Sequence, residues 1–274
     1  RAASILGTLQ AGYTDFKFLT DTSKLIFDRE ALLGVSITGW MNNPDILFDE
    51  KILQKGAEIV KEVNKEMAAI IGINPAARTT CVKPSGNASV LLQTASGIHA
   101  EHSNMYIRNV QMNKESEITQ AIMKTNPYMV EDSVWSAGGT DVVVSFPILP
   151  KKGSMYKDDL LGVKHLELVK KAQKHWVEAG TNEDLCADKG VRHNVSNTII
   201  VDNWEEVEKY VFENRHSFAG ISFLAMTGDK DYNQAPNTAV ITAKDMVKKY
   251  GNAAVFASGM VVDALKVFNN LWDA

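Results

Sequence analysis

Apolar positions recur along the chain in two periods, one typical of helices and one typical of strands. Residues 49–71 and 160–179 repeat apolar side chains at three- and four-residue spacing, which predicts two long amphipathic helices. Gly72 and Gly180 follow these runs, as is common where a helix stops. Shorter helices are predicted at residues 1–10, 116–125, 204–214, 242–249 and 259–271, with a single helical turn at 89–92.

Short apolar or alternating runs between these helices predict β-strands. They are residues 35–39, 78–82, 106–111, 141–146, 195–201 and 220–224. The run 141–146 is nearly all apolar, as in strands that are buried on both faces. Strands that alternate with helices of this length indicate an α/β fold. Spacing alone does not separate an open sheet from a barrel.

Composition narrows the function classes. The chain has 274 residues and a net charge of -4, from 29 basic and 33 acidic residues, so it has no general attraction to nucleic acid. No apolar run approaches the roughly 20 residues that span a membrane. The two separated cysteines predict a reducing cytoplasm, without a disulfide framework or zinc spacing. We assign residues 1–274 to a single domain.

The most specific local pattern is residues 80–89, Thr-Cys-Val-Lys-Pro-Ser-Gly-Asn-Ala-Ser. It predicts a strand, a tight turn and the start of a helix. Gly86 lets the backbone approach a ligand, and Ser85, Asn87 and Ser89 supply side-chain donors. Free N–H groups at a helix start favour an anion such as phosphate. The alternative is a plain turn followed by a capped helix.

Ordered blocks of the sequence resemble ribonucleotide reductases, most closely the adenosylcobalamin-dependent class II enzymes. The blocks are residues 34–39 (GVSITG), 80–86 (TCVKPSG), 96–103 (SGIHAEHS), 106–108 (YIR), 190–199 (GVRHNVSNTI), 218–224 (FAGISFL) and 232–236 (YNQAP). They spread over much of the chain, which makes the resemblance more specific than one short motif.

The resemblance implies an α/β fold that is part of a ten-stranded barrel built from two antiparallel half-barrels. The chain would be its C-terminal half, with the N-terminal part missing. It also implies the reduction of ribonucleotides to 2′-deoxyribonucleotides. In that chemistry a cysteine thiyl radical takes the 3′ hydrogen, water leaves the 2′ carbon, and a cysteine pair supplies the electrons. The implied cofactor is adenosylcobalamin, and the implied partners are a ribonucleoside di- or triphosphate and an external thiol reductant such as thioredoxin.

In this family the Pro-Ser-Gly loop binds the substrate phosphates. Carried over to this sequence, the phosphate-binding residues are Pro84, Ser85, Gly86, Asn87 and Ala88. Asn87 departs from the threonine expected there, which puts the side-chain geometry at that position in doubt. The family's thiyl cysteine lies in an Asn-x-Cys-x-Glu motif that this chain lacks. We therefore expect the catalytic cysteine and glutamate upstream of Arg1, and we expect the fragment alone to be inactive.

Further residues are candidates for lining the substrate. They are Ser89, His99, Arg108, His193 and Asn194. Arg108 could contact a phosphate or pair with a carboxylate, and His193 with Asn194 could simply form hydrogen bonds at a strand end. The spacing of His99, Glu101 and His102 is a weak metal pattern, and we predict no metal site. Cys81 is interpreted as a core thiol and Cys186 as a surface thiol.

Three rival interpretations stay open. A class I large subunit shares the barrel and the loop, but it carries a tyrosine pair that is absent around His193. A non-catalytic nucleotide-binding protein derived from the same barrel is the second rival. An unrelated phosphate-binding α/β enzyme is the third, and it leaves the blocks at residues 96–108 and 190–199 unexplained.

Overall fold

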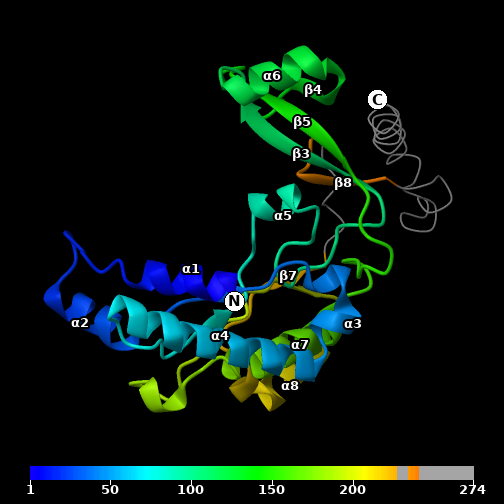
Figure 1. Cartoon of the computed structure of the whole chain (residues 1–274). Helices are drawn as coiled ribbons and strands as arrows, with labels where there is room; N and C mark the ends of the chain where they lie inside the picture. Colours follow the sequence, from blue (N-terminus) through cyan, green and yellow to red (C-terminus); the bar gives the residue numbers. More distant parts are fainter. Residues whose placement is uncertain (227–233, 241–274) are drawn as a thin grey trace. The chain divides into compact units, whose positions relative to one another are not determined.

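The structure is a computed structural model that describes residues 1–226 and 234–240 (Figure 1). The chain forms two compact units, the first made of Arg1–Ala100 and Lys152–Met226 and the second of Glu101–Lys151 and Thr227–Ala274. The assignment of the whole chain to one domain stays a prediction. Within the described ranges, no helix combines the length and the apolar character needed to cross a membrane.

Short parallel strands run through the first unit. β1 (Val35–Ser36) pairs in parallel with β2 (Thr80–Cys81). Val82 then forms a parallel bridge with Val195, and β6 (Ile199–Val201) pairs in parallel with β7 (Phe223–Ala225). The four predicted strands of this unit are therefore present, each shorter than predicted, and neighbours in sequence are neighbours in space.

Helices flank these strands. The longest is α4 (Glu50–Ile71), where the Asp49 side chain accepts a hydrogen bond from the Ile52 amide at 2.9 Å and Gly72 ends the helix in the left-handed conformation. The other helices of the unit are α1 (Ala2–Ala11), α2 (Asp21–Glu30), α3 (Pro44–Leu47), α5 (Asn87–Leu91), α7 (Gly162–Ala172) and α8 (Trp204–Glu213), with 3-10 turns at Trp40–Asn42, Glu183–Leu185 and Arg215–Ser217.

The predicted helix at residues 160–179 changes type in its second half. After α7 the chain continues as a π-helical turn, η3 (Gln173–Glu178). This turn contacts β2 directly: the Thr80 hydroxyl donates to the Trp176 carbonyl at 2.6 Å, and the Trp176 indole N–H donates to the Cys81 carbonyl at 3.0 Å. The Trp176 carbonyl also accepts from the Gly180 amide at 3.1 Å, so it joins the end of the helix to the strand that leads to the candidate loop.

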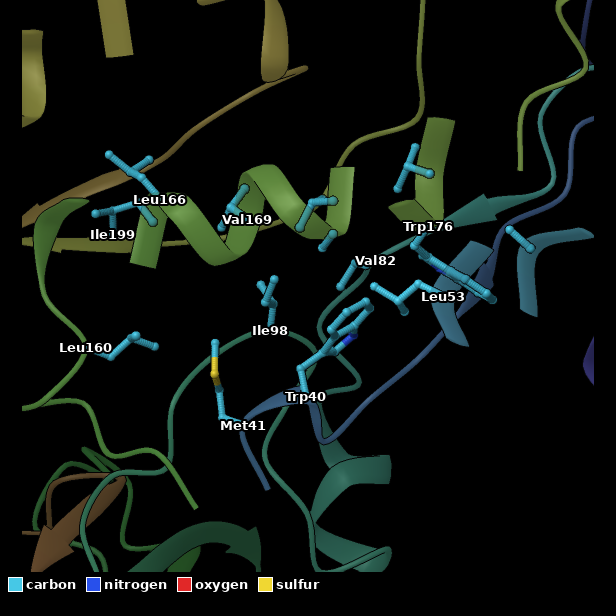
Figure 2. Packing of buried hydrophobic residues seen from close by; sticks show 14 of the residues in the cluster. Trp40, Met41, Leu53, Val82, Ile98, Leu160, Leu166, Val169, Trp176 and Ile199 are labelled. Carbon is cyan, nitrogen blue, oxygen red and sulfur yellow. The ribbon is translucent and has the colours of Figure 1, made fainter. Parts of the chain in front are cut away.

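The hydrophobic core of the first unit lies between α4, α7 and the strands (Figure 2). Trp40, Met41 and Ile98 are fully buried and face Leu166 and Val169 of α7. Val82 is also fully buried. The candidate loop leaves the core at Val82 and the chain returns to it at Ile98, so apolar burial fixes both ends of this segment.

The second unit is built on an antiparallel sheet in the order β4–β5–β3–β8. Its strands are β3 (Tyr106–Asn113), β4 (Val130–Asp132), β5 (Asp141–Ile148) and β8 (Asn237–Ala239), and the helix α6 (Glu117–Thr125) and the 3-10 turn η2 (Pro127–Met129) connect β3 to β4. Tyr106 pairs with Ile148 at one end of the β3–β5 ladder and Asn113 with Asp141 at the other. The middle of β5 is buried, as its apolar run predicts.

Some helices and strands were not predicted, and two predicted helices fall outside the described residues. The sequence pattern did not predict α2, β4 or β8. The helices predicted at residues 242–249 and 259–271 lie outside the described residues, as do Tyr232 and Asn233 of the block at 232–236.

Candidate functional site

The candidate loop connects β2 to α5. Gly86 has φ 53° and ψ -126°, a conformation that side chains rarely adopt, and a Cβ added there would meet no atom within 4 Å. Glycine is therefore needed for its backbone freedom. The expected contribution of a helix N-terminus is smaller than the sequence suggested, because α5 has only five residues and so a weak dipole.

Hydroxyl groups hold the loop from two sides. The Ser85 amide donates to the Ser96 hydroxyl at 2.9 Å, and the hydroxyl oxygens of Ser85 and Thr38 lie 2.7 Å apart. The Gly97 amide donates to the same Thr38 hydroxyl at 2.9 Å. Just before the loop, the Lys83 amide donates to the Ser36 hydroxyl at 3.0 Å. Three segments, around residues 36–42, 83–89 and 94–99, thus form one hydrogen-bonded cradle.

A buried asparagine fixes the return segment of this cradle. The side-chain oxygen of Asn42 accepts from the Thr94 hydroxyl at 2.7 Å and from the Ala95 amide at 2.6 Å. Its amide nitrogen donates to the Ser154 hydroxyl at 3.0 Å. Gly97, at φ 56°, lies so close to the loop that an added Cβ would be 2.9 Å from the Lys83 carbonyl oxygen. The cradle is therefore both anchored and tightly packed.

Two histidines stabilise the same return segment. A ring nitrogen of His99 lies 3.0 Å from the Ser96 carbonyl, and Nε2 of His165 lies 3.0 Å from the Ile98 carbonyl. A carbonyl only accepts a hydrogen bond, so in each of the two histidines the nitrogen that faces the carbonyl carries a hydrogen. Burial lowers the pKa of His165 to about 4, although the hydrogen bond to Ile98 opposes the shift. His165 is therefore neutral at physiological pH.

The predicted phosphate residues have mixed surroundings. Pro84 and Ala88 are exposed, Ser85 is half-buried, and the Ala88 amide donates back to the Ser85 carbonyl at 3.1 Å. Ser89 is buried, and its hydroxyl donates to the Gly86 carbonyl at 2.6 Å. Ser89 therefore shapes the loop, and its role in lining a substrate stays a prediction.

His193 and Asn194 lie beside β2. Nδ1 of His193 is 3.1 Å from the Thr80 carbonyl, and the Val82 amide donates to the Asn194 carbonyl at 3.2 Å. The pKa of His193 is lowered, first by burial and then by the charge of Arg78, against the effect of its hydrogen bond to Thr80. These contacts are strand-edge hydrogen bonds, and a contact with substrate stays a prediction.

Arg108 belongs to β3 of the second unit, where it pairs with Phe146 and Asn237. No ion pair of Arg108 with a carboxylate occurs among the described residues, and both alternatives for this side chain, phosphate contact and carboxylate pairing, stay predictions. The neighbouring Tyr106 hydroxyl donates to Glu101 at 2.9 Å. No group of three or more His, Cys, Asp or Glu side chains in the described ranges is placed to hold a metal ion.

The two cysteines differ from each other. Cys81 is half-buried, and burial raises the pKa of its thiol. The interpretation of Cys186 as a surface thiol is wrong: only 8% of it is exposed, and its sulfur lies 3.4 Å from the Asn182 carbonyl. Its sulfur also lies 3.6 Å from the Ala77 carbonyl, so a segment distant in the sequence packs against it, which the polar residues before Cys186 do not reveal.

Sequence reasoning missed three hydroxyl residues of the cradle: Ser36, Thr38 and Ser96. Two of them lie in the block 34–39 and one in the block 96–103, so the resemblance marked these segments without marking the residues. Their contacts with the loop span 47 residues for Ser36 and Thr38 and 11 for Ser96. Local pattern carries no signal for contacts of that separation.

Comparisons with known proteins agree on one group of enzymes. No protein-family model matches the chain. It is 28% identical over 163 residues to a probable adenosylcobalamin-dependent ribonucleoside-triphosphate reductase of Dictyostelium discoideum, covering 58% of this chain and 21% of that protein. It is 23% identical over 224 residues to the adenosylcobalamin-dependent ribonucleoside-triphosphate reductase of Euglena gracilis, covering 80% of this chain and 28% of the relative.

A solved structure agrees in fold. A B12-dependent class II ribonucleotide reductase superposes with a TM-score of 0.70 over 98% of this chain and 39% of that one, at 16% sequence identity. The chain is similar to part of a class II ribonucleotide reductase. The resemblance noted in the sequence is thereby confirmed, and the described strands and helices have the fold of the corresponding part of such a reductase. The chain spans between about a fifth and two fifths of these proteins.

Proposed function

We propose that the chain is the C-terminal part of a ribonucleotide reductase catalytic barrel, which reduces ribonucleotides to 2′-deoxyribonucleotides for DNA synthesis. Two relatives with this activity in their names and a solved structure of the same fold support the proposal. The parallel strands from β1 to β7 would be one side of the ten-stranded barrel. The relatives' names favour a ribonucleoside triphosphate as substrate, and a class II enzyme over the class I rival.

The phosphate role of residues 84–88 rests on one observation, the hydroxyl cradle around Ser85. A phosphate needs several donors and little competing negative charge. The loop offers the backbone flexibility of Gly86, the hydroxyl of Ser85 and the neighbouring hydroxyls of Thr38 and Ser96. The hydrogen bonds that hold the described part of this cradle join hydroxyls, backbone amides and a carbonyl, and none of them involves a carboxylate. The assigned phosphate-binding residues are Pro84, Ser85, Gly86, Asn87 and Ala88.

The radical chemistry is placed outside this chain. Neither Cys81 nor Cys186 lies in an Asn-x-Cys-x-Glu motif, so the thiyl cysteine and its glutamate would be supplied by another part of the complete protein. The chain alone would then bind substrate phosphates without turnover. An external thiol such as thioredoxin would restore the reducing cysteines.

Adenosylcobalamin is the proposed cofactor because both relatives are named for it. When bound, it supplies the radical that starts the reaction. The residues described in this chain do not show a fit to it: their histidines with ring hydrogen bonds hold backbone carbonyls or other side chains. We assign them no contact with the cofactor.

The test is Gly86→Ala in the complete protein. An alanine at φ 53° and ψ -126° costs about 1–3 kcal/mol of backbone strain, which displaces the loop. We expect KM for the ribonucleotide to rise roughly 10- to 100-fold, because each 1.4 kcal/mol of lost binding is about tenfold. The measurement is steady-state reduction of a ribonucleoside triphosphate with adenosylcobalamin and a dithiol.

The matched control is Gly139→Ala in the second unit. Gly139 also has a positive φ, 63°, and open space around its Cβ position, but it lies in the turn before β5. It should leave KM unchanged. Equal KM values for both variants would remove the loop from the substrate site. Absence of any reductase activity in the complete wild-type protein would favour the non-catalytic nucleotide-binding alternative.

A further inference from the structure

The Thr38 hydroxyl has two possible acceptors for its single hydrogen. Its oxygen lies 2.7 Å from the Ser85 hydroxyl, 3.0 Å from the Ala95 carbonyl and 2.9 Å from the Gly97 amide. A hydroxyl has one proton and two lone pairs. The Gly97 amide takes one lone pair, since an amide only donates. The Thr38 hydroxyl can then donate its single hydrogen either to the Ala95 carbonyl or to the Ser85 hydroxyl.

Two proton arrangements satisfy this geometry without moving a heavy atom. In the first, Thr38 donates to the Ala95 carbonyl and Ser85 donates to Thr38. In the second, Thr38 donates to Ser85, and the Ser85 hydroxyl keeps its hydrogen but can point it toward a ligand. The Ala95 carbonyl loses nothing essential in the second arrangement, because it also accepts from the Gly39 amide at 2.9 Å. In both arrangements the Ala95 carbonyl and the Thr38 hydroxyl each keep hydrogen-bond partners.

The second arrangement is the one an anion would select. A phosphate oxygen at the loop offers Ser85 a charged acceptor, and hydrogen bonds to charged acceptors are the stronger ones. Rotation of two hydroxyl hydrogens then turns Ser85 from a donor to Thr38 into a donor to the ligand. Because the backbone does not have to rearrange, binding costs the cradle little free energy of reorganisation.

Ser96 adds a further donor at the same place. Its oxygen accepts from the Ser85 amide at 2.9 Å, and the Ser85 hydroxyl lies 3.5 Å away. Among the described residues no group accepts the proton of Ser96 itself. Ser96 is half-buried beside the loop and is fixed through its oxygen, so its proton is available to a ligand that lies against Ser85.

We propose that Thr38 is a positioning residue whose hydroxyl turns from the Ala95 carbonyl to donate a hydrogen bond to Ser85 when phosphate binds, and that Ser96 contacts the phosphate directly as a second hydroxyl donor. The ligand class is the phosphate chain of a nucleotide. This inference rests on the proposed function of the loop, and it adds two residues that neither the sequence blocks nor the relatives' names assign.

The experiment measures equilibrium binding of cytidine triphosphate (CTP) to the complete protein, by calorimetry, with inorganic triphosphate as a competitor. The variants are Thr38→Val, Thr38→Ser and Ser96→Ala. The matched control is Ser116→Ala, which also removes a hydroxyl that accepts a backbone amide but lies at the start of α6, outside the cradle. Thermal unfolding without ligand monitors the fold of each variant.

We expect Thr38→Val and Ser96→Ala each to weaken CTP binding about 10- to 100-fold, the range for one hydrogen bond to a charged group. The affinity for inorganic triphosphate should fall by the same factor. Thr38→Ser should restore binding to within about threefold of wild type, because it keeps the hydroxyl, and Ser116→Ala should also stay within about threefold.

The outcomes separate the two proposals. If inorganic triphosphate does not compete with CTP in the wild type, the loop is not a phosphate site and the proposed function fails. If it competes but Ser96→Ala binds as well as Ser116→Ala, the assignment of Ser96 is overturned. If Thr38→Ser is as weak as Thr38→Val, the hydroxyl is not what matters, and the positioning role of the Thr38 hydroxyl is overturned. Should Thr38→Val fail to fold, Thr38→Ser and Ser96→Ala still decide: normal binding by Ser96→Ala or weak binding by Thr38→Ser overturns the proposal.

Discussion

Removing the buried carboxylate of Glu30 should destabilise the first unit strongly. Oε2 of Glu30 accepts from Arg78 at 2.6 Å, and Oε1 accepts from Arg29 at 2.8 Å. The side chains of Arg78 and Glu30 are only 5% and 9% exposed. Burial alone would raise the pKa of Glu30, but the hydrogen bonds from Arg29 and Arg78 outweigh it and leave the pKa lowered. The pair is therefore ionised at neutral pH.

The magnitude follows from what Arg78 keeps after Glu30→Gln. Loss of one partner of a buried ion pair costs about 3–5 kcal/mol, because the remaining charge stays buried. Arg78 still donates to the Val191 carbonyl at 2.9 Å and to the Asp188 carbonyl at 2.9 Å. These contacts place the cost at the lower end, about 3 kcal/mol. For a unit of this size that lowers Tm by roughly 6–12 °C.

The assay combines thermal unfolding with amide hydrogen exchange. The Val35 amide, which donates to the Thr79 carbonyl at 2.8 Å, reports on the strand pair that Arg78 adjoins. The control is Glu58→Gln, which breaks the exposed pair with Lys55, where the side chains are 54% and 65% exposed. Such surface pairs contribute under about 1 kcal/mol. Equal Tm values for the two variants would refute the argument that burial makes the Glu30 pair costly to break.

Two further predictions concern groups near the cradle. The folded pKa of His165, about 4, lies below its usual value of 6.5, so the unfolded chain binds the proton more tightly and stability is lost as pH falls from about 6.5 toward 4. Between pH 7 and pH 5 this contributes about 2 kcal/mol, which urea titrations should detect in wild type and not in His165→Gln; parallel pH profiles would contradict it. Cys81→Ala should keep turnover of the complete protein within about twofold, because a buried thiol with a raised pKa is a poor nucleophile. Complete loss of turnover would show a redox role.

Helices with their own end signals could be predicted from the sequence. For α4, α6 and α8 the capping side chains Asp49, Ser116 and Asn203 each accept a hydrogen bond from an amide three residues on. Cap and apolar stripe both lie within the element, so local sequence determines it. α2 has such a cap at Thr20, but its apolar residues 25–27 are consecutive and exposed, so they form no stripe with helical spacing.

Features that depend on distant partners could not be predicted. The residues of the π-helical turn Gln173–Glu178 have ordinary helical periodicity in the sequence. The contact of this turn with Thr80, whose hydroxyl donates to the Trp176 carbonyl, joins residues far apart in the chain and cannot be predicted from local sequence. The strands of the first unit are shorter than their apolar runs, whereas β3 and β5 extend two residues beyond theirs, because the paired stretch depends on the neighbouring strand. The loop around Gly86 was predicted from its own residues. Its supports Thr38 and Ser96 were not, because they come from other segments.

The register of the parallel strands explains which candidates gather at the loop. Val35 pairs with Thr80 and Ser36 with Cys81, so continuing this register puts Thr38 level with Lys83, at the carboxyl end of β2 where the loop begins. Ligands of parallel α/β sheets bind at this end of the strands.

The same register separates His193 from the loop. Val195 pairs with Val82, which puts His193 level with Thr80, before the loop begins. The residues of that segment that run on beyond the level of Val82 are Ser196 and Asn197. Asn197 is 5% exposed, and its side-chain nitrogen donates to the Val195 and Gly220 carbonyls at 2.7 and 3.1 Å. The register thus brings the hydroxyl of Thr38 to the start of the loop, and the contacts of His193 and Asn197 give the third strand a structural part at this end of the sheet.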